Sequence, residues 1–355
     1  MVWLGTMDTL PSGIVHVSNP EHGLWGDRSP WQLVEVAKIG TRLDSGPEVF
    51  GNVWDIDVDE SGRVYVFDWQ AWDVRLFERD GRYVRTIGRR GGGPGEFRRV
   101  NGIAVDSANR LWVNNQGNLR YSVFDSSGLL VSEPRKGGSS VEFVTWRSIF
   151  GTDGDLYEEI GYRTPSGLGF GLARFDPITQ QHIDTLPQCR FPEDTKFPTG
   201  ISALVADGWW CGVSLTYRLS QLNFTGDTVR IVERAHEADL FSAAERDSAK
   251  RQERDLNRRV RQGEIDLETI LRPIFQTVLV DDLDHLWVML APQPEDQNTR
   301  FDIFDPIGRY LGKAAAAHVI ERTPAPVFRD GRIYYVTKDE LDVQYVVVAE
   351  IRGRK

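Results

Sequence analysis

The chain has 355 residues, a formal net charge of −10 and a sequence pI of about 5.2, and 40% of its residues are hydrophobic. This hydrophobic content can form a sizeable core and excludes an intrinsically disordered chain. The acidic charge argues against a nucleic-acid partner, because binding nucleic acid requires a basic surface that displaces counterions from phosphate.

No apolar run approaches the roughly 18 residues that a membrane helix requires, so we expect no transmembrane segment. Residues 1–10 lack the basic and apolar regions of a signal peptide. A chain without a signal and a chain from which an export signal has been removed both fit this segment. The only cysteines are Cys189 and Cys211, which excludes a zinc-binding spacing and leaves open a single disulfide, suited to an exported protein.

A motif repeats in the N-terminal half at a spacing of 47 residues. The paired positions are Phe50 and Phe97, Asp59 and Asp106, Arg63 and Arg110, Tyr65 and Trp112, Phe77 and Phe124, and Gly81 and Gly128. An unbroken register over six positions is hard to obtain by chance and indicates a repeat architecture.

Each copy of this motif predicts four short antiparallel strands. In the first copy, residues 53–58 and 63–67 alternate with the period of a strand, and 60–62 have turn chemistry. Residues 73–77 and 83–87 predict two further strands. Four strands in a repeat of forty-odd residues are typical of a propeller blade.

Weaker copies follow along the chain and bring the number of blades to six. Their marker segments are 155–157 and 174–176, 208–210 and 222–226, 284–288 and 303–308, and 331–335 and 345–351. We therefore predict an all-β fold, a six-bladed β-propeller over residues 31–355, preceded by an N-terminal extension, 1–30. Residues 34–40 resemble the fourth strand of the first copy, so we expect them to complete the last blade and close the ring.

Residues 238–270 interrupt the strand pattern. They are rich in Glu, Arg, Lys and Ala and contain no proline, which predicts a helical insertion between blades four and five. A solvated spacer and a docking surface for a partner are both compatible with this composition.

The sequence resembles bacterial six-bladed propeller proteins related to NHL repeats. The resemblance rests on residues 62–68, 77–81, 87–89 and 92–97. It implies an exported, periplasmic or extracellular protein. Related propellers include esterases, lactonases, amidating lyases and pure binding scaffolds. The fold alone therefore does not decide the function.

Propeller geometry predicts where a site would lie. The innermost strands of all blades begin on one face, here called the entry face, and the loops between second and third strands lie there too. Two of those loops, 158–169 and 291–300, are expected to be long. Candidate ligand-binding residues on this face are Trp54, Arg99, Asn101, Trp146, Arg147, Tyr162, Tyr217, Gln276 and Arg300, with Trp69 and Trp72 as further candidates.

Aromatic walls, amides and guanidinium groups suit an organic ligand that carries carboxylate or carbonyl groups. A structural role is the alternative, in which Trp54 and Trp146 pack between blades and the arginines pair with nearby acids. We accordingly expect a noncatalytic, exported, monomeric ring that binds a small organic molecule, a glycan or a protein. No metal site and no cofactor are assigned. A calcium-assisted hydrolase or lyase remains an alternative, with Asn52, Asn101, Glu158 and Glu321 as conceivable oxygen ligands, and a structural subunit of a membrane-associated assembly is a second alternative.

Overall fold

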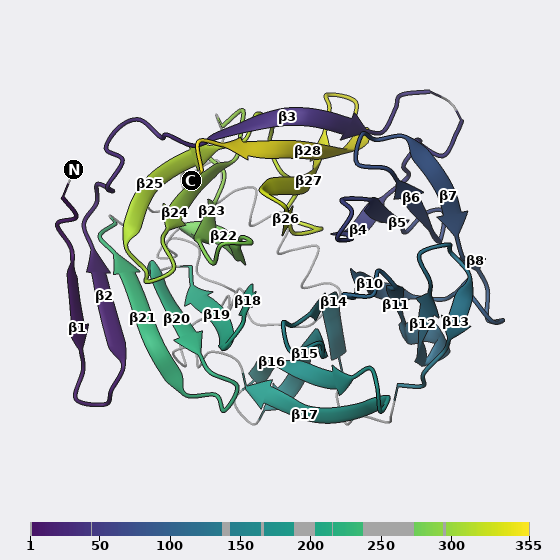
Figure 1. Cartoon of the computed structure of the whole chain (residues 1–355), viewed down its shortest axis with the longest axis horizontal. Coiled ribbons are helices and arrows are strands. Elements are labelled where there is room, and N and C mark those ends of the chain that lie inside the picture. Colours follow the sequence, from purple (N-terminus) through teal and green to yellow (C-terminus); the bar gives the residue numbers. More distant parts are fainter. Residues whose placement is uncertain are drawn as a thin grey trace.

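The computed structural model describes residues 2–43, 45–136, 143–164, 167–187, 203–214, 216–236, 273–293 and 296–354, with the backbone alone at 143–147, 161–164, 167–170, 182, 187 and 213. Six β-sheets stand around a central channel as the blades of a propeller (Figure 1). The prediction of an all-β, six-bladed propeller is confirmed.

Blades 1 to 3 are four-stranded antiparallel sheets with strands in chain order from the channel outward. Blade 1 consists of β4 (Val53–Val58), β5 (Val64–Asp68), β6 (Asp73–Phe77) and β7 (Tyr83–Ile87). Blade 2 consists of β10 (Val100–Val105), β11 (Leu111–Asn115), β12 (Arg120–Phe124) and β13 (Leu130–Ser132). Blade 3 consists of β14 (Phe143–Phe150), β15 (Leu156–Thr164), β16 (Gly167–Asp176) and β17 (Gln181–Pro187). The short parallel pair β8 (Arg89–Arg90) and β9 (Glu96–Phe97) links blades 1 and 2, and a 3-10 turn, η1 (Gln116–Asn118), lies between β11 and β12.

Blades 4 and 6 contain strands from the N-terminal end of the chain as well as their own, and blade 5 lies between them. Blade 4 contains β18 (Ala203–Val205), β19 (Gly208–Val213), β20 (Arg218–Leu222) and β21 (Thr228–Arg234), followed by β2 (Val15–Asn19) and β1 (Thr6–Thr9). Blade 5 consists of β22 (Phe275–Val280), β23 (Leu286–Leu290), β24 (Arg300–Phe304) and β25 (Tyr310–Ala315). Blade 6 consists of β26 (Val327–Arg329), β27 (Arg332–Lys338), β28 (Gln344–Arg352) and β3 (Gln32–Ile39).

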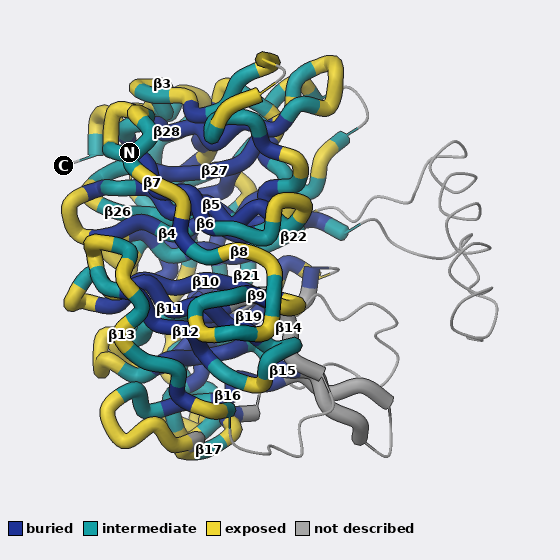
Figure 2. The backbone as a smooth tube through the Cα atoms, turned by 90° about the vertical axis from the view of Figure 1, so that its right-hand side faces the viewer, coloured by how far each residue is buried: buried dark blue, intermediate teal, exposed yellow. Residues whose placement is uncertain are grey.

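The hydrophobic core is divided among the contacts between neighbouring blades. Each of six buried apolar clusters joins one pair of adjacent blades, so that every blade is held from both sides. Figure 2 shows the inner strands β4, β5, β10 and β11 as buried, while the turns at the ends of the blades are exposed. Burial of large aromatic side chains such as Trp287 makes these contacts strongly favourable.

The 47-residue repeat encodes the turn between the first and second strands of a blade. Asp59 accepts the backbone N–H groups of Ser61 and Arg63, and its other oxygen binds Arg63 Nε at 2.7 Å. Asp106 and Arg110 repeat this geometry, also at 2.7 Å. A side chain that satisfies the turn's own amides fixes the turn, which explains the strict spacing of Asp and Arg.

The ring closes through the N-terminal strand β3, as predicted. β3 pairs antiparallel with β28, with Ile39 opposite Val346 and Gln32 opposite Arg352. Figure 1 shows this pair along the outer edge of blade 6. Because the two ends of the chain share one sheet, opening the ring requires breaking the ladder between β3 and β28.

The N-terminal extension forms a hairpin on the outside of blade 4. β2 pairs parallel with β21, with Val17 opposite Val232, and β1 pairs with β2, so this blade has six strands instead of the expected four. The chain then crosses blade 5, where the backbone N–H of Trp25 donates to the carbonyl of Leu311 at 2.7 Å. The first 31 residues thus contact blades 4 and 5 before β3 joins blade 6 (Figure 1).

Two predictions concern residues that the structure leaves undescribed. The expected helical insertion, 238–270, lies outside the described residues, and the described ranges contain no α-helix. Cys189 is also outside them, while Cys211 is disulfide-bonded. No helix in the described ranges is long and apolar enough to cross a membrane.

Candidate functional site

The entry face is the end of the ring at which the six inner strands begin. The described strands that border the undescribed ranges 137–142, 165–166, 188–202, 215, 237–272 and 294–295 begin or end at this face. The prediction of a long loop at this face over residues 158–169 is wrong. β15 and β16 instead continue as a ladder in which Gly161 pairs with Phe170. The glycines in this segment hide the strand pattern, but backbone hydrogen bonds do not need side chains.

The candidates at the strand entries lie in β-bulges. The pairing of β4 with β5 skips Trp54, that of β10 with β11 skips Asn101 and Gly102, and that of β22 with β23 skips Gln276. The pairing of β14 with β15 skips residues 145–147, which include Trp146 and Arg147. Because a bulge re-aims a side chain at the rim of a sheet, its repetition in four blades marks this rim as a built feature of the channel mouth.

Three tryptophans form a continuous row on blade 1, here called the tryptophan row. The ring centroids of Trp54 and Trp69 are 5.1 Å apart, and those of Trp69 and Trp72 are also 5.1 Å apart, with interplanar angles of 36° and 35°. All three side chains are half-buried and pack on the apolar cluster between blades 1 and 2. The row leads from the start of the inner strand to the loop between the second and third strands.

One cationic side chain adjoins the outer end of the row. The guanidinium carbon of Arg90 lies 5.4 Å from the ring centroid of Trp72, within the range of a cation–π contact. Arg90, Arg98 and Arg99 are all exposed, and Arg99 has a left-handed backbone with φ 49°. An apolar wall with a guanidinium group against it can bind an organic anion.

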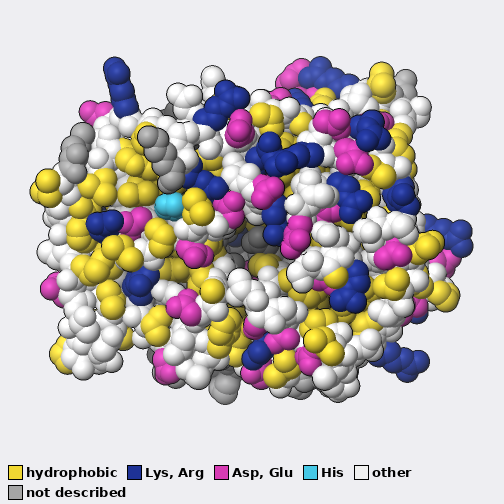
Figure 3. Space-filling view, in the orientation of Figure 1, with side chains coloured by type: hydrophobic (Ala, Val, Ile, Leu, Met, Phe, Trp, Pro, Cys, Tyr) yellow, Lys and Arg dark blue, Asp and Glu magenta, His cyan; other side chains and the backbone are white. Residues whose placement is uncertain are grey.

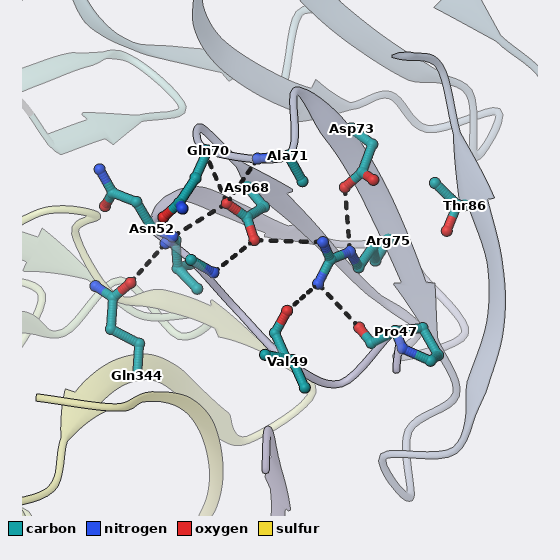
Figure 4. A network of polar contacts seen from close by, with 12 residues as sticks. Pro47, Val49, Asn52, Asp68, Gln70, Ala71, Asp73, Arg75, Thr86 and Gln344 are labelled. Carbon is teal, nitrogen blue, oxygen red and sulfur yellow. Dashed lines mark hydrogen bonds and ion pairs between the residues drawn. The ribbon is translucent and has the colours of Figure 1, made fainter. Parts of the chain in front are cut away.

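Asp68 holds the two chain segments that carry the tryptophans (Figure 4). It is buried, and its Oδ1 accepts the backbone N–H groups of Asn52 at 3.0 Å and Gln70 at 2.9 Å. Its Oδ2 accepts the N–H of Gly51 at 2.8 Å. The N–H of Trp69 donates to the carbonyl of Asn52 at 2.8 Å, so the loop and the strand entry are fixed to each other.

Arg75 completes this network beneath the row. Its Nη2 lies 3.4 Å from Asp68 Oδ2, its Nε donates to Asp73, and its Nη1 donates to the carbonyls of Pro47 and Val49. Burial raises the pKa of Asp73, and the neighbouring charge of Arg75 opposes that rise. The support of the tryptophan row is therefore a connected polar network with its charges paired.

The remaining candidates fall into three groups. Gln276 and Arg300 line a cavity of about 20 Å³, and Arg300 pairs with Asp296 at 2.8 Å. Tyr217 is only 1% exposed and its hydroxyl donates to Asp302 at 2.6 Å, so we leave it out of the proposed ligand-binding set. Trp146, Arg147 and Tyr162 lie in β14 and β15, and their side chains are outside the description.

The two carboxylates named for a calcium site are each paired with a lysine. Glu158 pairs with Lys136 at 2.8 Å and also accepts from Asn114, while Glu321 pairs with Lys338 at 3.0 Å. A calcium ion at either carboxylate would have to displace a lysine. Within the described ranges, no three side chains of His, Cys, Asp or Glu come together as metal ligands.

Trp69 and Trp72 were only further candidates from the sequence, and Arg90 was not among the predicted site residues. The signal lay in the repeat itself, because the positions 47 residues after Trp69 and Trp72 hold Gln116 and Leu119. A left-handed backbone occurs at both Trp72 and Leu119 and belongs to the shared turn, whereas the indole rings are particular to blade 1.

Comparisons with known proteins agree with this architecture. A family described as 6-bladed beta-propeller, DUF5128, matches residues 48–126, which span blade 1 and most of blade 2. Human NHL repeat-containing protein 3 is 34% identical over 91 residues, and its mouse counterpart is 33% identical over 131 residues. The chain is a six-bladed β-propeller similar to NHL-repeat proteins. The matches cover 25% and 35% of the propeller chain and span 26% and 35% of these two relatives.

Solved structures resemble the propeller over nearly its whole length. A presumed exported protein of Bacteroides fragilis NCTC 9343 has a TM-score of 0.56 at 15% identity, covering 95% of this chain and 99% of that chain. A member of the DUF4221 family from Bacteroides vulgatus has a TM-score of 0.53 at 12% identity, covering 91% and 98%. At these identities the likeness concerns the fold.

Proposed function

We propose that this propeller is a noncatalytic, exported binding module whose entry face takes a small organic ligand, a free acid or an acidic glycan, with an apolar body and a carboxylate. The tryptophan row carries this proposal. Three half-buried indole rings in contact offer a rigid apolar rim, and the exposed side chain of Arg90 lies against the ring of Trp72.

The rim is preorganised for binding. Asp68 and Arg75 fix the loop and the strand entry before any ligand arrives, so little conformational entropy remains to be lost on association. Aromatic contacts contribute about 0.5–1.5 kcal/mol each beyond the area they bury. A guanidinium adds directional hydrogen bonds to a carboxylate.

Two observations support export. Cys211 is disulfide-bonded, and disulfides persist mainly in oxidising compartments. A structural neighbour from Bacteroides fragilis is a presumed exported protein.

The observations favour binding over calcium-assisted hydrolysis or elimination. Glu158 and Glu321 are paired with lysines, whereas the loop that carries Trp69 and Trp72 is already fixed to the strand entry by Asp68. The proposal of a structural subunit of a membrane-associated assembly depends on residues 238–270, outside the described ranges.

Isothermal titration calorimetry tests the proposal. The ligands are a trigalacturonate and an aromatic carboxylate, each compared with its uncharged amide. The proteins are the native chain and the variants Trp72→Ala, Arg90→Ala and Trp25→Ala. Trp25 is the matched control, because it is also half-buried but lies on blade 5. We expect an acid to bind at least tenfold more tightly than its amide, and Trp72→Ala and Arg90→Ala to remove most of that binding. Failure of every acid to bind, or equal losses with Trp25→Ala, would contradict the proposal.

A further inference from the structure

The opposite mouth of the channel contains a cavity larger than the one lined by Gln276 and Arg300 on the entry face. This mouth, here called the turn face, carries the turns between first and second strands, and its cavity measures about 520 Å³. The channel behind it encloses about 170 Å³, and Val105, Phe150 and Arg329 line both spaces. Figure 3 looks onto this face and shows a central hollow bordered by basic and acidic side chains.

Arg329 places a guanidinium between the two spaces. It is the last residue of β26 and is half-buried. With the described residues it makes no ion pair, and none of them offers an acceptor to its enclosed Nε. Because the side chain is half-buried and lines both spaces, its guanidinium can pair with an anion in the cavity.

The turn that follows Arg329 is held by the blades on both sides. Asp330 lies 3.4 Å from Arg79 of blade 1, and the N–H of Gly331 donates to Asp282 beside blade 5 at 2.8 Å. The backbone at Arg329 is therefore positioned by the ring itself, which favours a preformed site over one that orders on binding.

The surrounding charges select a ligand with one negative charge. Asp59 and Asp106 line the cavity, but each is neutralised by the arginine of its own turn at 2.7 Å. Glu60 also lines the cavity and is exposed. The unpaired charge of Glu60 disfavours a doubly charged phosphate, whereas one carboxylate can pair with Arg329, which among the described residues lining this cavity makes no ion pair.

The same cavity has an apolar side. Phe150, Pro177 and Ile178 line it, and Ile178 is 90% exposed. An exposed large aliphatic side chain beside a cavity can cover the hydrocarbon part of a ligand. We infer that the turn face is a second binding site, centred on Arg329, for a small monocarboxylate with an apolar body.

Ligand-observed NMR with cyclohexanecarboxylate as the probe tests this inference. Cyclohexanecarboxamide is the uncharged counterpart, and inorganic phosphate is the doubly charged one. We expect millimolar binding of the acid, and at least tenfold weaker binding of the amide and of phosphate. Arg329→Gln should weaken acid binding at least tenfold. Arg329→Lys keeps the charge but loses the planar guanidinium, so its affinity for the acid should lie between those of the native chain and Arg329→Gln.

Arg332 provides the matched control. It lies opposite Arg329 in the same hairpin and is also half-buried, but it does not line the cavity. Arg332→Gln and Trp72→Ala should leave acid binding unchanged, with thermal unfolding confirming that each variant is folded. Equal binding of acid and amide, or a loss with Trp72→Ala but not with Arg329→Gln, would overturn the inference. The latter result would support the entry-face proposal, so the two sites are tested separately.

Discussion

The carboxylate of Asp68 lies 3.4 Å from the guanidinium of Arg75, with both side chains buried at the base of the loop that carries Trp69 and Trp72. Asp68 also accepts four backbone N–H groups, from Gly51, Asn52, Gln70 and Ala71. The pair therefore connects the stability of blade 1 to the shape of the proposed ligand rim.

Asp68→Asn should destabilise the propeller by about 3 kcal/mol, because it removes one of the two carboxylates that pair with the buried charge of Arg75 and weakens the acceptor of four backbone N–H groups. Urea unfolding measures this loss, and Asp80→Asn, in an exposed turn of the same blade, is the control. Ligand binding at the entry face should weaken together with stability. A variant with native stability would show that the ion pair is dispensable.

Asn19 connects the N-terminal hairpin to two blades. Its Nδ2 donates to the carbonyls of Gly308 and Glu233, and its Oδ1 accepts the N–H of Tyr310 at 2.7 Å. Asn19→Ala leaves these groups unsatisfied and should cost about 3 kcal/mol in the free energy of unfolding. Ser18→Ala, one residue earlier on β2, should change it by less than about 0.5 kcal/mol.

Asp281 should give the propeller a stability that depends on pH. Burial alone would raise its pKa, but hydrogen bonds from His285 and Trp287 bring that pKa down to about 2. A lowered carboxyl pKa stabilises the fold above its unfolded value, and the stabilisation is lost as the pH falls toward the folded value. The difference in unfolding free energy between the native chain and Asp281→Asn should therefore narrow by about 2 kcal/mol between pH 5 and pH 2.5. Asp284→Asn, exposed in the same turn, should show no such change.

Gly88 has a left-handed backbone, with φ 74°, and lies against the ring of Phe97. A methyl group there would overlap that ring, so Gly88→Ala should cost about 3 kcal/mol or more from strain and overpacking together. Gly154 has a similar φ of 84° but open space around it, and Gly154→Ala should cost only about 1 kcal/mol. Equal losses in the two variants would refute a role for the Phe97 contact.

The sequence predicted the blades that carry the repeat and missed what has no local pattern. Asp59 and Asp106 each close a turn through neighbouring amides, so a spacing of 47 residues was sufficient to locate blades 1 and 2. The β3 strand was found because it resembles β7. The parallel pairing of β2 with β21 joins residues more than 200 positions apart, and no local signal names the partner of a strand.

For the candidate site too, the sequence predicted the positions that follow the repeat and missed the contacts that depend on the folded loop. Repeat register placed Trp54, Asn101 and Gln276 at equivalent strand entries, and the structure finds each of them in a bulge. The contact of Trp54 with Trp69, and of Trp69 with Trp72, depends on how a loop folds over blade 1. That fold is set by the buried carboxylate of Asp68, which no periodicity reveals.

A crystal structure of the propeller with the tightest-binding acid of the calorimetric panel tests the central claim most directly. The account predicts ligand density along Trp54, Trp69 and Trp72, with the carboxylate within hydrogen-bonding distance of Arg90 or Arg99. Density confined to another part of the ring, with the tryptophan row bare, would contradict it.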